Sequence, residues 1–292
     1  MRDTMFRRTL ALLSIAVMAL AAGCSTIRFS YNQGDTLLYW WINSYVDFDA
    51  QQAAIAKRDI SGLFQWHRQT QLRDYAALLG SFQQKLAGNP SQADLIQGYR
   101  EIRVRGERLA QRAVPELTTL ALSITPAQIA NIDKKFKAKN DEYRRKFMSG
   151  SVEKRQRARC KKSMEQLEQW FGRFSNEQEA TLRRACELRP LDNQQWLEER
   201  QYRQQRILAL LQEVQQKKLS REQTTARVQA LMRELFTRME SPERKAFYDA
   251  SIDHTTRYIL TAINIATPQQ KAHAQQRMQG WINDLEALAA GK

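Results

Sequence analysis

The same signal for the start of a helix recurs along this chain. A Ser or Thr before a helix accepts a hydrogen bond from a backbone N–H of the first turn, and a Gln or Glu three residues later accepts one from the N–H of that Ser or Thr. Residues 125–128, 175–178, 220–223 and 267–270 all have this pattern, each ending in Gln. The repeated signal predicts a chain built from many helices.

Apolar residues between these signals recur at helical spacing. Val228, Leu231, Met232 and Leu235 stand at i, i+3, i+4 and i+7, so they would share one helix face. Pro115 should kink or split its helix, because proline removes a backbone hydrogen bond. The predicted helices cover residues 36–46, 49–87, 92–122, 126–148, 152–171, 176–188, 193–217, 221–238, 242–264 and 268–288.

The composition favours helices over sheets. The chain has only 11 Gly and 6 Pro in 292 residues, and no segment alternates apolar and polar residues as a strand does. We therefore expect an all-α fold, a multi-helix bundle of antiparallel helical hairpins without a β-sheet.

The first 23 residues have the organisation of a secretory signal peptide. Three arginines precede an apolar run at residues 10–22, which is shorter than the about 20 residues of a membrane span. The small residues that end at Gly23, directly before Cys24, resemble the lipobox of bacterial lipoproteins, which is cleaved before its cysteine. Ala21 departs from the pattern, because lipoboxes usually carry Leu there. This resemblance implies a lipid-modified Cys24.

We therefore expect three parts in the chain. These are a signal peptide over residues 1–23, a lipid-anchored tether over 24–34 and an all-helical periplasmic domain over 35–292. Two or more acyl chains on one residue anchor a protein stably to a membrane. Ser25, rather than Asp, follows the cysteine, which by resemblance to the usual sorting rule of lipoproteins implies the outer membrane.

Positive charge is concentrated in one stretch of the chain. The formal net charge is +15, and residues 134–162 alone hold thirteen basic and three acidic residues. The thirteen are Lys134, Lys135, Lys137, Lys139, Arg144, Arg145, Lys146, Lys154, Arg155, Arg157, Arg159, Lys161 and Lys162.

A basic stretch usually indicates nucleic-acid binding, but an exported protein does not meet nucleic acid in the periplasm. The anionic partners there are lipid headgroups, lipopolysaccharide, peptidoglycan, acidic unfolded chains and acidic protein surfaces. The alternative is a solvated helical face without a partner.

Cys160 and Cys186 are predicted to form a disulfide. With Cys24 lipidated, these two cysteines would remain in an oxidising compartment, where disulfides persist. They are equally far from a turn predicted near Gly172, which places both about 16 Å from that turn on antiparallel helices. The alternative is a pair of buried free thiols.

Residues able to carry catalysis or bind a metal are scattered. His67, His254 and His273 lack a partner at zinc-protease spacing, and no Cys-x-x-Cys occurs. Asp47 and Asp49 could bind a cation, but a helix cap and a first-turn charge explain them more simply. We expect no enzymatic activity, no cofactor and no metal.

Five aromatic residues lie between positions 39 and 48, just after the predicted anchor. Leu38, Trp41, Ile42 and Tyr45 would share one helix face, so we expect them to dock into the helical core. Trp40 points elsewhere, toward a membrane interface, which Trp favours.

Two resemblances bear on function. The segment at residues 31–49, which begins Tyr-Asn-Gln-Gly-Asp-Thr-Leu-Leu-Tyr-Trp-Trp, resembles the opening of a family of proteobacterial lipoproteins of unknown function. That resemblance implies a helical lipoprotein and brings no catalytic residues. The helix starts at Thr125, Ser175 and Ser220 are also similar to the Leu-Thr-x-x-Gln motif of small periplasmic stress chaperones, which bind unfolded chains.

Two functions stay open from the sequence. The first is a non-enzymatic structural or interaction lipoprotein, whose basic helical hairpin at residues 134–162 contacts envelope polyanions or a protein partner. The alternative is a chaperone-like binder of unfolded polypeptides.

Overall fold

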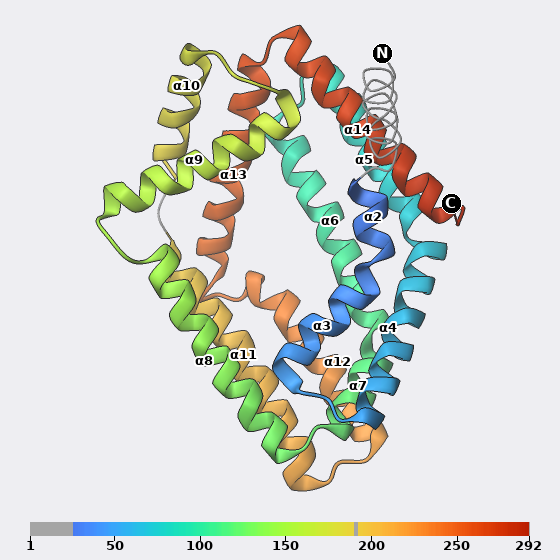
Figure 1. Cartoon of the computed structure of the whole chain (residues 1–292). Helices are drawn as coiled ribbons and strands as arrows, with labels where there is room; N and C mark the ends of the chain where they lie inside the picture. Colours follow the sequence, from blue (N-terminus) through green and yellow to red (C-terminus); the bar gives the residue numbers. More distant parts are fainter. Residues whose placement is uncertain (1–25, 190–191, 292) are drawn as a thin grey trace, which may run out of the picture.

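The computed structural model describes residues 26–189 and 192–291, and every regular element in that part of the chain is a helix (Figure 1). The elements are α2 (Thr26–Asn32), α3 (Gly34–Val46), α4 (Ala50–Thr70), α5 (Leu72–Ala87), α6 (Gln92–Arg112), α7 (Val114–Ser123), α8 (Pro126–Phe147), α9 (Val152–Phe171), α10 (Asn176–Glu187), α11 (Asn193–Lys217), α12 (Arg221–Thr237), the 3₁₀ turn η1 (Arg238–Glu240), α13 (Lys245–Ile265) and α14 (Pro268–Ala289). The predicted all-α fold is confirmed.

The helices pack in pairs around a frame with two separate cores. The principal pairs are α5 with α14, α8 with α11, α7 with α12, α3 with α4, α9 with α10 and α6 with α13. One core joins α9, α10, α13 and α14 at the upper end of Figure 1, and the other joins α3, α7, α8 and α11 toward the lower end. No described helix is long and apolar enough to cross a membrane.

The four predicted capping boxes are all formed, and a further box begins α4. Three of the predicted glutamines, together with Gln52 of the further box, also join distant helices. Gln128 closes the box at the start of α8, and Gln52 closes the box at the start of α4. Their side-chain amides hydrogen bond to each other. Gln52 also donates to the carbonyl oxygen of Ser123 at 2.7 Å, and Gln128 donates to that of Asp47 at 3.1 Å. Each amide thus binds the backbone two residues before the other helix's cap.

The same arrangement recurs in the upper core. Gln178 of α10 and Gln270 of α14 hydrogen bond to each other through their amides. Gln178 donates to the carbonyl oxygen of Ile265 at 2.7 Å, and Gln270 donates to that of Arg173 at 2.8 Å. These carbonyls again lie two residues before the opposite cap, so each core has one reciprocal glutamine pair at its helix starts.

One predicted helix is divided in two, and one predicted break is present. The helix expected over 49–87 is two helices that meet at Gln71, because α4 packs against α3 and α7 while α5 runs along α14. The break expected at Pro115 is present, since α6 ends at Arg112 and α7 begins at Val114 with the proline in its first turn.

The expected tether over residues 24–34 is wrong from Thr26 onward, where α2 begins. This short helix packs against α14, and Arg28 forms an ion pair with Asp284 at 3.2 Å. The Tyr31 hydroxyl lies 2.9 Å from Nδ1 of His67, whose Nε2 lies 3.3 Å from the Tyr75 hydroxyl. These tertiary partners hold a segment whose own sequence does not call for a helix.

Helix α3 docks with only part of the face that was expected. Ile42, Tyr45 and Val46 pack into the lower core, and the amide of Asn131 donates to the carbonyl oxygen of Tyr45 at 2.9 Å. Trp41 was expected there as well, but its side chain is 61% exposed. The contacts of α3 with α4 and α8 bury the side centred on Ile42, and Trp41 lies beyond its edge.

Candidate binding sites

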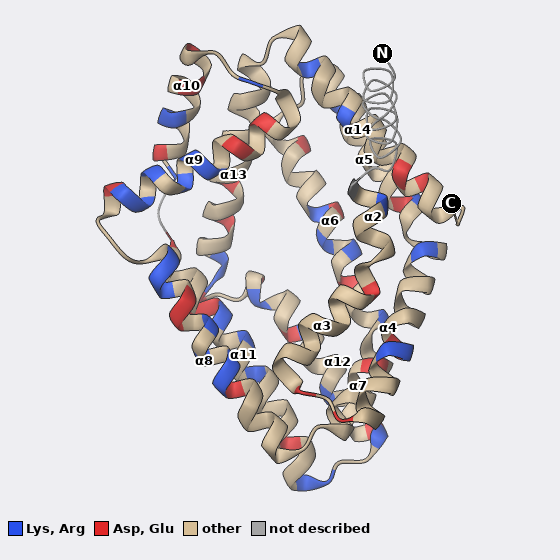
Figure 2. Cartoon of the chain, in the orientation of Figure 1, with Lys and Arg blue, Asp and Glu red and all other residues tan. Residues whose placement is uncertain are grey.

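The predicted basic residues fall on two helices, α8 and α9, as the blue segments of Figure 2 show. Eleven of the thirteen are exposed, and Arg155 and Arg159 are half-buried. The two helices do not form the hairpin that we expected. They diverge from the corner at residues 148–151, because α8 packs on α11 while α9 packs on α10 and α14 (Figure 1).

The α8 part of the stretch keeps most of its positive charge. Lys137, Lys139 and Arg144 pair with acidic residues three or four positions away on the same helix. Exposed pairs of this kind are worth less than about 1 kcal/mol each. Among the described residues, no acidic side chain forms an ion pair with four exposed cations of α8, which are Lys134, Lys135, Arg145 and Lys146. These four residues are called the α8 basic face below.

The α9 part is different, because it borders acidic side chains. A cleft of about 770 Å³ between α9 and α10 is lined by three basic residues, including Arg157 and Lys161, and by five glutamates. The glutamates are Glu153, Glu165, Glu168, Glu179 and Glu187. This side of the stretch therefore presents mixed charge rather than a basic surface.

Arg159 has a structural role that its sequence context did not reveal. Its guanidinium donates to the carbonyl oxygens of Cys186, at 3.1 Å, and of Arg189, so it caps the end of α10. Burial, together with the nearby Arg189, lowers the pKa of Arg159 from its usual value. Arg159 is half-buried and its Nη2 is hydrogen bonded within the protein, so it is less accessible to a polyanion than the exposed cations of the stretch.

The predicted disulfide between Cys160 and Cys186 is present and joins α9 to α10. The two Cα atoms are 5.7 Å apart, and both residues are buried in the upper core. Leu167 and Leu182 pack in the same core. The bridge closes the hairpin that carries the mixed-charge cleft.

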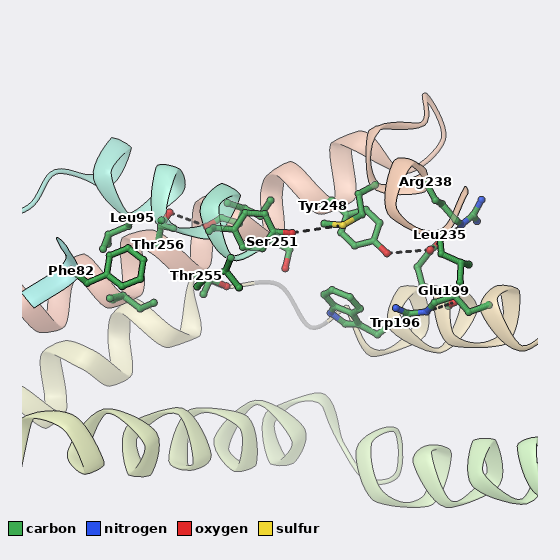
Figure 3. A pocket seen from close by; sticks show the side chains of 17 residues that line it. Phe82, Leu95, Trp196, Glu199, Leu235, Arg238, Tyr248, Ser251, Thr255 and Thr256 are labelled. Atoms are coloured by element: carbon green, nitrogen blue, oxygen red, sulfur yellow. Dashed lines mark hydrogen bonds and ion pairs between the residues drawn. The ribbon is translucent and has the colours of Figure 1, made fainter. Parts of the chain in front are cut away.

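A pocket of about 570 Å³ lies between α6, α11 and α13, with Phe82 of α5 at one end (Figure 3). Its lining is mostly apolar and includes Leu95, Ile102, Trp196 and Leu235. The Trp196 ring stands edge-on to Phe247 and Tyr248 of α13. Sequence reasoning missed this pocket because its walls come from segments spread between residues 82 and 259.

A buried carboxylate closes one end of the pocket. Glu199 is only 1% exposed, and it accepts hydrogen bonds from Nε of Arg238 at 2.9 Å and from the hydroxyl of Tyr248 at 3.1 Å (Figure 3). It also forms an ion pair with Nε of Arg244 at 2.8 Å. Burial and the neighbouring Glu199 raise the pKa of Tyr248 to about 12. Two guanidinium groups and one hydroxyl converge on this carboxylate, so the network joins α11, η1 and α13.

A second apolar pocket, of about 640 Å³, lies between α3, α7, α8, α11 and α12. Arg203 of α11 lines both pockets, and its Nε donates to the carbonyl oxygen of Glu199 at 3.2 Å. The two pockets therefore follow one another along α11. In the part of the chain that is described, no group of His, Cys, Asp and Glu is arranged to hold a metal ion.

Comparison with known proteins identifies the family. The model of DUF6279, a family of unknown function, matches residues 44–240. The chain belongs to this family. No curated protein and no solved structure matches the chain. The DUF6279 match contains the α8 basic face, the disulfide and Glu199, whereas α13, which supplies Tyr248 to the apolar pocket, follows the matched region.

Proposed function

We propose that this DUF6279 member is a non-enzymatic lipoprotein, anchored through Cys24 on the periplasmic side of the outer membrane, whose α8 basic face contacts envelope polyanions. The signal-like residues 1–23, the lipobox-like residues before Cys24 and the following Ser25 support the anchor. The first 25 residues lie outside the part of the chain that the structure describes.

The observation that carries the binding proposal is the set of exposed cations on α8. Lys134, Lys135, Arg145 and Lys146 form no ion pair with a described acidic side chain. A basic residue near an anionic lipid surface contributes about 1 kcal/mol of binding free energy, and the attraction decays over a Debye length of about 8 Å at physiological salt. Lipid phosphates and lipopolysaccharide phosphates both supply this surface.

Vesicle binding of the mature chain with Cys24→Ser tests the proposal. The protein should bind phosphatidylglycerol vesicles more tightly than phosphatidylcholine vesicles, and added salt should remove the difference. Lys134→Gln with Lys135→Gln should lower the affinity for anionic vesicles by up to about thirtyfold, given about 1 kcal/mol for each of the two cations at the surface.

Lys217→Gln with Lys218→Gln is the matched control, because it removes the same charge from an exposed position at the end of α11. It should leave the binding almost unchanged. An equal loss of affinity in both double variants would overturn the role of the α8 basic face. It would show that the binding depends on the overall charge of the protein and not on where the charges lie. Vesicles that carry lipopolysaccharide distinguish the two phosphate sources.

The two apolar pockets along α11 favour a second candidate, a chaperone-like binder of unfolded polypeptides. Unfolded chains expose apolar side chains that pockets of this size and lining could bury. The protein should then slow the aggregation of a denatured client. Ile102→Asp at the pocket should weaken this effect, whereas Val152→Asp, at a similarly exposed site on α9, should not. A wild-type protein without any effect on aggregation would contradict this candidate.

A further inference from the structure

The N-terminal helices present large apolar side chains to the surroundings. Leu37, Trp40 and Trp41 of α3 are 53%, 62% and 61% exposed, and Phe29 of α2 is 66% exposed. Positions 37, 40 and 41 follow the i, i+3, i+4 spacing, so the three α3 side chains lie on one side of the helix. We call these four residues the aromatic face.

The structure holds this face outside the core. The adjoining side of α3 carries Ile42, Tyr45 and Val46 into the lower core. Beyond the end of the helix, the backbone N–H of Phe48 donates to the side chain of Asn43 at 2.8 Å. The Trp41 ring stands edge-on to Tyr45 and borders the second apolar pocket. The core side of α3 is already occupied, so the aromatic face cannot turn inward without breaking these contacts.

The aromatic face is also close to the predicted anchor along the chain. Helix α2 begins at Thr26, two residues after Cys24, and Phe29 is five residues after it. A chain extends at most about 3.6 Å per residue, so Phe29 stays within about 18 Å of Cys24. A bilayer that holds acyl chains on Cys24 is therefore permanently within reach of Phe29, and α3, which carries the rest of the face, follows α2 directly in the chain.

We propose that the aromatic face inserts into the interfacial layer of the bilayer in which Cys24 is anchored. This inference rests on the lipid anchor of the proposed function. Trp side chains favour the membrane interface, where the indole ring is buried and its N–H stays hydrated. A surface helix with Trp and Leu on one side buries that side about 5–10 Å into the boundary between headgroups and acyl chains.

The consequence is a membrane attachment at two points. An acyl anchor alone leaves the domain free to rotate about the lipid, because a few residues join it to the bilayer. Insertion of Leu37, Trp40 and Trp41 adds a contact that belongs to the folded domain itself. Because α3 packs directly on α8, the orientation of the domain, and with it that of the α8 basic face, becomes fixed relative to the bilayer.

Tryptophan quenching in neutral vesicles tests the insertion. The mature chain is coupled through the thiol of Cys24 to a maleimide phospholipid in phosphatidylcholine vesicles, some of whose acyl chains are brominated. The other two cysteines are joined in the disulfide and do not react. Brominated chains should quench a clear fraction of the emission from the six tryptophans. Trp40→Phe with Trp41→Phe should remove most of that quenching while the protein stays coupled.

Trp196→Phe is the control, because Trp196 lies between α11 and α13 and not on the aromatic face. This variant should be quenched by the same absolute amount as the wild type. Absence of quenching in the wild type, or equal quenching in the Trp40/Trp41 variant, would overturn the inference. A concentration-dependent dimer that shields both residues from aqueous iodide in the absence of vesicles would overturn it too, by assigning the face to a second copy.

The chemical anchor separates this inference from the proposed function. An unmodified Cys24 in the native protein would contradict the lipoprotein proposal. The quenching result on the coupled protein would still decide whether the aromatic face enters a bilayer. Neutral vesicles also remove the attraction between the α8 basic face and anionic lipid, so quenching there reports on the aromatic face alone.

Discussion

At the scale of single residues, the capping glutamines do more than begin helices. Gln178 satisfies the backbone of its own cap, the carbonyl oxygen of Ile265 and the amide of Gln270 at once. Gln223 has the same local sequence position at the start of α12, but its side chain is exposed, and among the described residues it hydrogen bonds only within its own cap. A comparison of Gln178 with Gln223 therefore separates the contribution of the local cap to stability from the contribution of the tertiary hydrogen bonds.

We predict that Gln178→Ala lowers the free energy of unfolding by about 2–3 kcal/mol, and Gln223→Ala by about 1 kcal/mol or less. The difference arises because removing Gln178 leaves the carbonyl of Ile265 and part of the amide of Gln270 without partners in a half-buried site. Urea unfolding followed by circular dichroism measures both variants. Equal losses would mean that the reciprocal pair adds nothing to the cap.

His67 predicts a dependence of stability on pH. Burial lowers the pKa of His67 from its usual value of 6.5, so the folded protein holds the imidazole neutral between two tyrosine hydroxyls. The unfolded chain binds the proton more readily, so the folded state loses stability as the pH falls below about 6.5 toward the lowered pKa. His67→Gln should reduce the slope of unfolding free energy against pH between 7 and 5. An unchanged slope in this variant would contradict the role given to His67.

At the scale of elements, the disulfide holds the α9–α10 hairpin together. Loop closure over a separation of 26 residues stabilises the folded state by about 3 kcal/mol in the chain-entropy model. We therefore predict that Cys160→Ser with Cys186→Ser lowers the melting temperature by about 5–10 °C for a chain of this size. Calorimetry checks the value, and reduced wild-type protein should match the double variant.

Thiol counting gives an independent test of the same bridge. The denatured, unreduced protein with lipidated Cys24 should contain no thiol that reacts with maleimide. Two reactive thiols per mature chain would rule out the disulfide.

Mass spectrometry of the native N-terminus tests the predicted signal peptide and the predicted lipid anchor. We predict that residues 1–23 are absent and that Cys24 carries acyl chains, as the lipobox-like sequence implies. The helix that follows almost at once, α2, leaves a short connection between this residue and the domain. A mature chain that still begins at Met1 would contradict the anchor.

At the scale of the whole molecule, the described helices form two separate hydrophobic cores at opposite ends and not one continuous core (Figure 1). Leu182 is fully buried in the upper core and Ile124 in the lower one. Truncation of a buried aliphatic side chain to alanine costs about 2–5 kcal/mol, and separate packing units can open separately.

We predict that Leu182→Ala accelerates amide hydrogen exchange mainly in α9, α10, α13 and α14, and that Ile124→Ala does so mainly in α3, α7, α8 and α11. Each substitution weakens the packing of its own core first. Exchange measured by mass spectrometry on both variants gives the pattern. A uniform increase over the described helices in either variant would show that the frame opens as one unit.

The sequence by itself determined most of the helices and most of their ends, with the exceptions of α2 and the break at Gln71. Cap residues and the Pro at position 115 act on the backbone of their own turn, and apolar spacing depends only on the helical repeat. These interactions join residues that are close together in the chain, so the local sequence is enough to predict them. The Cys160–Cys186 bridge was predictable for a related reason, because a short turn between two helices sets which positions face each other.

Tertiary structure decided what joins the helices and what the surface presents. The exposure of Trp41, the divergence of α8 from α9 and the cap that Arg159 forms on α10 all depend on which helices pack beside them. The apolar pocket with Glu199 at its end is assembled from helices that are distant in the chain. Helical periodicity predicts which side of a helix is apolar. Which other helix covers that side is decided only when the complete chain packs.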